Sequence, residues 1–479
     1  MILNLKNFFS EQLFKDIIWN FLGTFISRMF LLISFIIIAR FLSIDEYGEA
    51  TVLRNTTNTL SIIAVGSLGL TVSKYIPKYL GINNYKLNSI MFISFLIVFI
   101  FSVMISFIMY YFSKEISLNI FNNSDLDLPI KIISFAVFFT ILNGFFNGIL
   151  TGLEKFKDIS LINIIYGLIS LPIILFSTYY YNIIGLSYAL TIISVFITIL
   201  YLNKLNIDKS IFNLQIKNLF SEIRVLYKFT LPSFLSGFSM GLMILYANHL
   251  LSIQYNGYLY LGIFGAAFYI SVISSNLNNV FSQVLFPKIV KQNEIPNNKL
   301  TFINTHLAWI ISLIINLPII FFPDLFVLVF GEKYNNQQFL VSVILIAYMC
   351  IFVSFRQGIN RNLAAKNLMW WGVIINIIWA VVIVSLSNIF IEYSAIGVSL
   401  SILLGYIFIT VFFLKFDIKN KLIDKELIFS KEILLIWLLI LLCSISNFID
   451  NIFIKLVLLL FVFYMIYRNI ILLWKRYSK

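Results

Sequence analysis

The chain is organised around residues 20–81, which read NFLGTFISRMFLLISFIIIARFLSIDEYGEATVLRNTTNTLSIIAVGSLGLTVSKYIPKYLG. One apolar run extends from Phe21 to Ala39 and a second from Thr51 to Val72, with a polar break at residues 42–48 between them. At a rise of about 1.5 Å per residue, a helix of about 20 apolar residues crosses the ~30 Å hydrocarbon core of a bilayer. The stretch therefore predicts two consecutive membrane-spanning helices.

The composition of the whole chain agrees with this prediction. Hydrophobic residues make up 60% of the sequence and charged residues 11%, and the mean hydropathy is +0.96, which excludes a water-soluble globule. Long, continuous apolar runs favour a helix bundle over a β-barrel, whose strands alternate in polarity. Cys350 and Cys443 lie inside apolar runs, where we interpret them as small hydrophobic residues rather than as redox or metal sites.

The sequence repeats itself at an offset of about 210 residues. The polar break at 42–48 has a counterpart at 251–257, with the same Leu-Ser-Ile opening and the same closing Gly. Further matches, in chain order, are the Pro-Lys pairs at 77–78 and 287–288, Gly148 with Gly358, Leu153 with Leu363, and Ile184–Ser187 with Ile396–Ser399. Several matches at a nearly constant offset indicate two homologous halves.

We therefore expect an all-α integral membrane protein of about 14 transmembrane helices, with two homologous six-helix lobes and two C-terminal helices. The expected domains are an N-lobe at 1–203, a cytoplasmic connector at 204–228, a C-lobe at 229–415 and the two extra spans at 416–479. Most of the 34 Lys and Arg residues then fall on one side, which predicts that both termini are cytoplasmic. The net charge of +13 is explained by this topology, so nucleic acid is not an expected partner.

The sequence carries none of the motifs that would build an enzyme or an ATP-driven motor. It has no G-x-x-x-x-G-K-[ST] loop, no H-E-x-x-H and no G-x-S-x-G, and its two histidines, His249 and His306, have no metal-ligand spacing. We expect no catalytic residue, no metal site and no cofactor.

Two arginines lie inside predicted spans. Arg28 falls near the middle of the first span, where an unpaired guanidinium costs at least ~2.5–3.5 kcal/mol, so it is expected to face water or protein. Arg54 is followed directly by the polar run Asn55–Thr59, which suggests that this part of the span lines a water-filled cavity. A structural hydrogen bond or ion pair for Arg28, and snorkelling for Arg54, are the alternatives. We favour anion binding for both.

Further cations lie at predicted span ends. Lys74, Arg356 and Arg361 lie at cytoplasmic ends, where they either attract an anionic head group or simply follow the positive-inside bias. His249, at the other side, is the repeat equivalent of Arg40 and can titrate near neutral pH, although a satisfied interfacial histidine is the alternative. The predicted spans contain essentially no Asp or Glu, which favours an anionic cargo over a lipophilic cation.

Short motifs support a more specific assignment. They are Ala39–Leu42 with Glu46–Gly48, Gly69–Tyr75, Gly152–Lys157, Lys228–Pro232, Phe286–Lys288 and Phe330–Tyr334. In this order they resemble the polysaccharide-type flippases of the multidrug/oligosaccharidyl-lipid/polysaccharide exporter superfamily, the group that translocates O-antigen and capsule repeat units. The resemblance covers roughly residues 10–415 and implies two lobes around a central cavity that opens alternately to each side.

The resemblance also implies the cargo and its surroundings. The cargo would be an undecaprenyl-type pyrophosphate carrying an oligosaccharide, moved from the inner to the outer leaflet of a bacterial cytoplasmic membrane. Membrane lipid is a further expected partner, with a polysaccharide polymerase and glycosyltransferases as candidates. The expected binding residues are Arg28, Arg54, Lys74, Arg356, Arg361 and His249. A cation-coupled multidrug antiporter, a lipid II flippase and a non-transporting scaffold for glycosyltransferases are the alternatives.

Overall fold

The computed structural model describes residues 11–80, 82, 84–205, 231–292, 298–366, 368–449 and 451–477. Helices dominate these ranges, and no strand occurs in any of them, as expected for an all-α membrane protein. Most of the expected connector at 204–228 falls outside the described residues. The chain divides into two compact units between Gly262 and Ile263.

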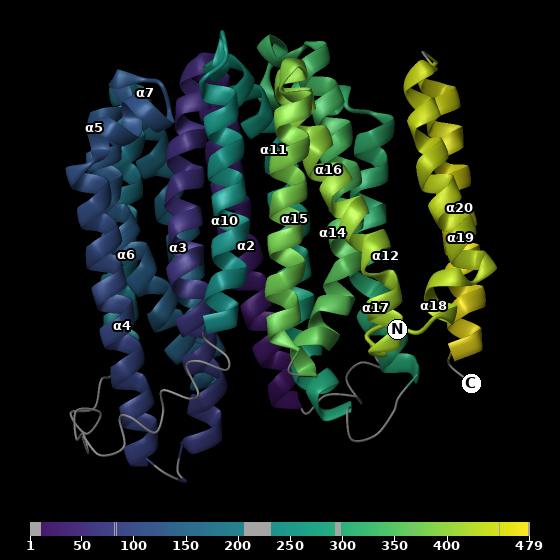
Figure 1. Ribbon diagram of the computed structural model, residues 1–479, viewed down its shortest axis with the longest axis horizontal. Coiled ribbons are helices and arrows are strands. Elements are labelled where there is room, and N and C mark those ends of the chain that lie inside the picture. Colours follow the sequence, from purple (N-terminus) through teal and green to yellow (C-terminus); the bar gives the residue numbers. More distant parts are fainter. Residues whose placement is uncertain are drawn as a thin grey trace. The chain divides into compact units, whose positions relative to one another are not determined.

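The first unit is built from long helices (Figure 1). They are α2 (Glu11–Phe41), α3 (Ile44–Tyr79), α4 (Asn84–Tyr111), α6 (Asp127–Gly152), α7 (Phe156–Leu205) and α10 (Leu231–Ser252). Residues 113–126, which we call the α4–α6 connection, contain the short elements α5 (Ser113–Glu115), η1 (Ile116–Ile120) and η2 (Ser124–Leu126), with a turn at 121–123. Helix α2 packs on α7, and α3 packs on α6 and α10.

The second unit continues from α11 (Gly257–Gln292), whose first turns belong to the first unit. Its long helices are α12 (Asn298–Phe321), α14 (Gln337–Ala365), α15 (Met369–Phe390), α16 (Ser394–Phe412) and α20 (Ile452–Tyr477). Short elements join them: α13 (Asp324–Phe330), η6 (Glu332–Tyr334), η7 (Ile391–Tyr393), α17 (Leu414–Lys419), α18 (Glu426–Phe429), α19 (Lys431–Leu442) and η8 (Cys443–Phe448). Helix α14 packs on α12 and α16.

The protein is a multi-pass membrane protein. Within the described residues, ten segments are long and apolar enough to cross a membrane. Two of them, Phe156–Leu205 and Met369–Phe412, are more than twice the length that one crossing needs. The first of the two extra C-terminal spans predicted within 416–479 corresponds to the 12-residue α19 and the 3-10 helix η8 that continues it, together residues 431–448. The count of fourteen and the lobe boundaries stay predictions.

The polar break at residues 42–48 is a helix start. Ser43 and Glu46 form a reciprocal capping box, in which each side chain accepts a hydrogen bond from the other residue's backbone N–H, at 3.1 Å and 2.7 Å. Tyr47 is fully buried, and a side chain at Gly48 would collide with the carbonyl oxygen of Tyr258 on α11. Each of these residues is thus needed where α3 begins and meets α11.

The sequence repeat reappears as a repeated backbone turn. Asn182 has φ 46° and ψ −132°, and Ser394, 212 residues later, has φ 53° and ψ −123°. Gly185 and Gly397 follow three residues after these turns, and each lies against a backbone carbonyl, that of Ser177 and Phe390 respectively. The two halves therefore make the same tight reversal between consecutive helices.

Candidate functional site

Arg28 lies on α2 where this helix approaches α7 closely. The approach depends on small residues, because a Cβ at Gly167 would come within 2.7 Å of the Cα of Ser27, and one at Gly23 would collide with Ser160. Ser27 is buried, whereas the Arg28 side chain next to it is exposed. Arg28 follows Phe21, the start of the apolar segment, by seven residues, or roughly 10 Å at the helical rise.

Two tyrosines of α7 complete the surroundings of Arg28. The guanidinium lies within electrostatic range of the hydroxyl groups of Tyr166 and Tyr201. Tyr201 is buried and forms a hydrogen bond with the side chain of Asn147 on α6. We call Arg28, Tyr166, Tyr201 and Asn147 the Arg28 cluster. One permanent cation beside hydroxyl and amide groups is a suitable set of ligands for phosphate oxygens.

Arg54 occupies a different environment within the same unit. Its side chain is 8% exposed, and the guanidinium carbon lies 4.9 Å from the centre of the Phe35 ring, a cation–π contact between α3 and α2. The following Asn55 donates to Asn248 of α10 across 3.4 Å. Of the polar run Asn55–Thr59, only Asn58 is exposed. The run thus packs mainly against protein.

His249 holds the α4–α6 connection. Its Nδ1 donates to the carbonyl oxygen of Ile120, which assigns the proton to that nitrogen. The hydroxyl of Tyr258 donates to the carbonyl of Phe121 across 2.7 Å, and Asn123 Nδ2 donates to Glu49 Oε1 across 2.8 Å. Residues from α3, α10 and α11 therefore fix one short segment. This arrangement matches the alternative interpretation of His249 as a satisfied histidine.

Arg356 and Arg361 lie in the interior of the second unit. Arg356 is 2% exposed and forms an ion pair of 2.7 Å with Asp417 of α17, which is 1% exposed. Arg361 is also buried and donates to the side chain and carbonyl of Asn304, each at 2.7 Å, and to Ser282 at 2.9 Å. Because both guanidinium groups are buried and bonded to protein groups, we do not carry forward the expectation that Arg356 and Arg361 contact the head group of a cargo.

The prediction for Lys74 falls outside what the structure describes, because only its backbone, in α3, is placed. The tyrosines and Asn147 of the Arg28 cluster were missed in the sequence, since one tyrosine among 25 gives no local signal. Glu49 was missed as well, although a carboxylate two residues before the apolar run that begins at Thr51 can be recognised from sequence alone. Asp417 gave no signal, because its partner lies 61 residues away.

Solved structures with the same fold are membrane transporters. An inward-facing multidrug resistance MATE family transporter of the MOP superfamily matches with a TM-score of 0.69 at 15% identity, over 83% of this chain and 94% of that one. A MOP superfamily transporter from Pyrococcus furiosus, described as having a binding pocket of reverse polarity, matches with a TM-score of 0.64 at 14% identity, over 87% of this chain and 96% of that one.

Sequence comparison agrees with the fold. An uncharacterized membrane protein of Methanocaldococcus jannaschii, MJ1068, is 23% identical, over 93% of this chain and 90% of that protein. The resemblance expected from the short motifs is confirmed by a family match to residues 13–293, more than half of the chain. The chain therefore belongs to the family described as "Polysaccharide biosynthesis protein".

Proposed function

We propose that this protein is a flippase, which moves an undecaprenyl pyrophosphate-linked oligosaccharide from the inner to the outer leaflet for the assembly of O-antigen or capsule. It works in a bacterial cytoplasmic membrane with both termini in the cytoplasm, and it is not an enzyme. The family match and the transporter fold support the general role. The cargo is argued from the Arg28 cluster.

The single observation that carries the proposal is an exposed arginine inside an apolar helix. A guanidinium exposed to lipid at this depth costs at least ~2.5–3.5 kcal/mol, and the cost falls when the group faces water. Arg28 is exposed beside the hydroxyl groups of Tyr166 and Tyr201, so we infer that it faces a wet interior.

A pyrophosphate bears about two negative charges and cannot cross hydrocarbon alone, so fixed donors must replace its water. Arg28 supplies a planar fork of N–H donors that fits two phosphate oxygens at once, and Tyr166 supplies a hydroxyl donor, while Tyr201 is buried and bonded to Asn147. The isoprenoid tail stays in lipid while the head group crosses. With two homologous halves, alternating access is the rocking of one half against the other about such a site.

The remaining candidate residues receive narrower roles. Arg54 is held against Phe35, so we assign it a long-range electrostatic contribution rather than a direct contact. Lys74 stays a proposed residue of first contact for the anionic head group of the cargo, at the cytoplasmic side. The alternative, a multidrug antiporter for organic cations, needs a carboxylate free to pair with its substrate. Asp417, a deeply buried carboxylate of the second unit, is instead engaged by Arg356.

The proposal is tested in cells that lack this protein, supplied with wild type, Arg28→Ala or Tyr201→Phe at equal membrane levels. Wild type should restore surface polysaccharide, Arg28→Ala should abolish it, and Tyr201→Phe should reduce it. Arg40→Ala, at the last turn of the same helix, is the matched control and should behave as wild type. If Arg28→Ala cells keep normal surface polysaccharide and lose dye efflux instead, the antiporter replaces the flippase as the best interpretation.

A further inference from the structure

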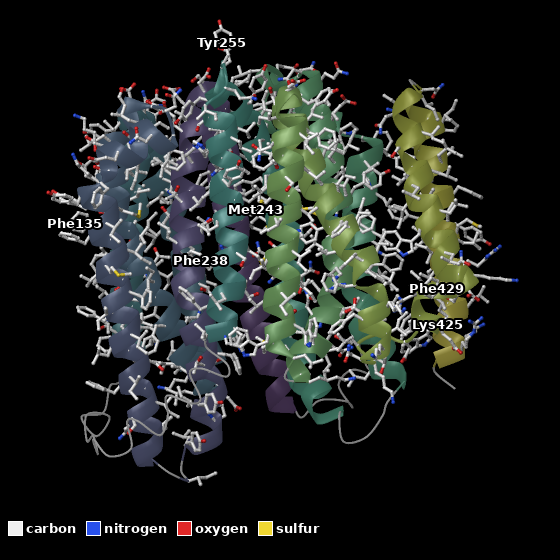
Figure 2. All side chains as sticks on the ribbon, viewed as in Figure 1. Phe135, Phe238, Met243, Tyr255, Lys425 and Phe429 are labelled. Atoms are coloured by element: carbon white, nitrogen blue, oxygen red, sulfur yellow. The ribbon has the colours of Figure 1, made fainter. Side chains whose placement is uncertain are left out.

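The α4–α6 connection is held by three helices that come from both halves of the sequence repeat. Glu49 lies on α3 in the first half, whereas His249, Ser252 and Tyr258 lie on the α10–α11 hairpin, which opens the second half. Ser252 donates to the same Ile120 carbonyl that His249 contacts, at 3.3 Å. Figure 2 shows Tyr255 at the tip of this hairpin, and its side chain is exposed.

Glu49 is the titratable group of this junction that receives a direct hydrogen bond from the connection. Asn123 donates to Glu49 with its amide nitrogen and accepts from the backbone N–H of Asp125 with its amide oxygen, at 2.9 Å. The same Asn123 side chain thus shapes the turn and holds it to α3. Any change in the charge of Glu49 acts directly on this contact.

The charged groups around Glu49 favour its protonated form. Asp45 and Glu46 face it from α3, and Asp125 faces it from the connection. The hydroxyl of Tyr258, on α11, also lies within electrostatic range, and His249, on α10, bonds the neighbouring turn. Burial and the three acids raise the pKa of Glu49 to about 7, against the smaller lowering effect of the Asn123 hydrogen bond. Glu49 precedes the apolar run that begins at Thr51.

We propose that Glu49 is a proton-binding site that controls how firmly the α4–α6 connection is held against α3 and α11. Protonated Glu49 lets the acidic residues pack together and keeps the connection closed. The ionised form repels Asp125 and is better solvated when the connection opens. Closing this junction therefore takes up a proton, and opening it releases the proton to solvent.

This inference goes beyond the proposed function, because it needs no cargo. In the expected topology the junction lies on the non-cytoplasmic side, where the α4–α6 connection of the first half meets the α10–α11 hairpin of the second. A proton taken up there favours the closed junction, so acid outside the cell would close it. The junction thus offers a way for pH to bias the conformational cycle.

The first test measures the proton directly. Infrared difference spectra of the purified protein in nanodiscs are recorded between pH 5.5 and 8.5. Wild type should lose the C=O band of a protonated carboxylic acid with a midpoint near pH 7, and Glu49→Gln should lack this band. Glu115→Gln, which removes an exposed acid of the same connection, is the matched control and should keep it. A band that persists in Glu49→Gln, or a midpoint below pH 5, overturns the proposal.

The second test measures the junction itself by amide hydrogen exchange of residues 113–126, corrected for the intrinsic effect of pH. Protection in wild type and Glu115→Gln should fall on the order of tenfold between pH 5.5 and pH 8, because the closed state binds the proton more tightly. In Glu49→Gln, a neutral stand-in for the protonated acid, protection should stay high at both pH values. Equal protection at both pH values in wild type contradicts the proposal.

Discussion

The guanidinium of Arg356 meets the carboxylate of Asp417 at 2.7 Å, from Nη1 to Oδ2, and neither side chain reaches solvent. Within the described residues, Arg356 Nη2 and Asp417 Oδ1 make no further hydrogen bond. The pair fixes α17, the start of the link toward the C-terminal helices, to α14. Asn362, further along α14, and Lys366, the residue that caps its C-terminus, strengthen this attachment by donating to the carbonyls of Leu422 and Asn420, at 2.6 Å and 3.1 Å.

Breaking this pair on one side should destabilise the protein strongly. Arg356→Met leaves a buried carboxylate without a cation, and such losses cost about 3–5 kcal/mol. The double variant Arg356→Met/Asp417→Leu removes both charges and should recover most of the loss. Thermal unfolding of the detergent-solubilised proteins measures the loss of stability in the single variant and its recovery in the double variant. A double variant that is no more stable than Arg356→Met would show that the two charges are not coupled.

Glu49 should give the wild type a pH-dependent stability. Because its pKa is raised from 4.5 to about 7 in the folded protein, its contribution to stability is fully present below pH 4.5 and is lost as the pH rises through 7. The transition temperature of wild type should therefore fall between pH 5 and pH 8 relative to that of Glu49→Gln. At pH 8 the variant should be the more stable protein. Parallel curves for the two proteins would contradict this.

The meeting of α3 and α11 should not tolerate a methyl group. Gly48→Ala places a Cβ against the carbonyl of Tyr258, a backbone atom that cannot move aside cheaply, and overpacking of this kind costs about 1–3 kcal/mol. Gly372→Ala on α15 is the matched control, since the nearest atom to its Cβ is a Leu363 methyl carbon at 3.4 Å. Unfolding temperature should drop for Gly48→Ala and change little for Gly372→Ala.

The two equivalent turns should respond alike to substitution. Asn182 and Ser394 have positive φ values, which cost a residue with a Cβ roughly 1–2 kcal/mol. Asn182→Gly and Ser394→Gly should leave the unfolding temperature equal or higher, whereas valine at either position should lower it. A loss of stability in both glycine variants would mean that side-chain contacts, rather than the backbone turn, hold these positions.

The sequence predicted the parts of this fold that depend on local pattern. Apolar run length predicted the membrane helices, and the match of Ile184–Ser187 with Ile396–Ser399 lies two residues after the equivalent turns at Asn182 and Ser394, although the turns themselves were not predicted. The break at 42–48 was located, but its capping box was not identified. The helical stretch before the last span was predicted, but its change to a 3-10 helix at Cys443 was not, because the length of an apolar run carries no signal for the type of helix.

The candidate site was less accessible to prediction, because it depends on contacts between distant residues. Arg28 was singled out by its depth alone, and its exposure beside Tyr166 and Tyr201 depends on how α2 packs on α7. Arg356 and Arg361 were predicted at a cytoplasmic span end, but their buried contacts are with Asp417 and Asn304, which lie 61 and 57 residues away. Charge spacing along one helix cannot show which partners it meets.

The central claim, a flippase that uses Arg28, is tested most directly by reconstitution. Purified protein is placed in liposomes that carry an undecaprenyl pyrophosphate-linked oligosaccharide, and an impermeant reagent measures how fast the sugar reaches the opposite leaflet. Wild type should accelerate this movement at least on the order of tenfold, and Arg28→Ala, which loses a charge-assisted bond to phosphate, should return to the protein-free rate. Equal rates with and without wild-type protein, or an Arg28→Ala rate equal to wild type, would contradict the account.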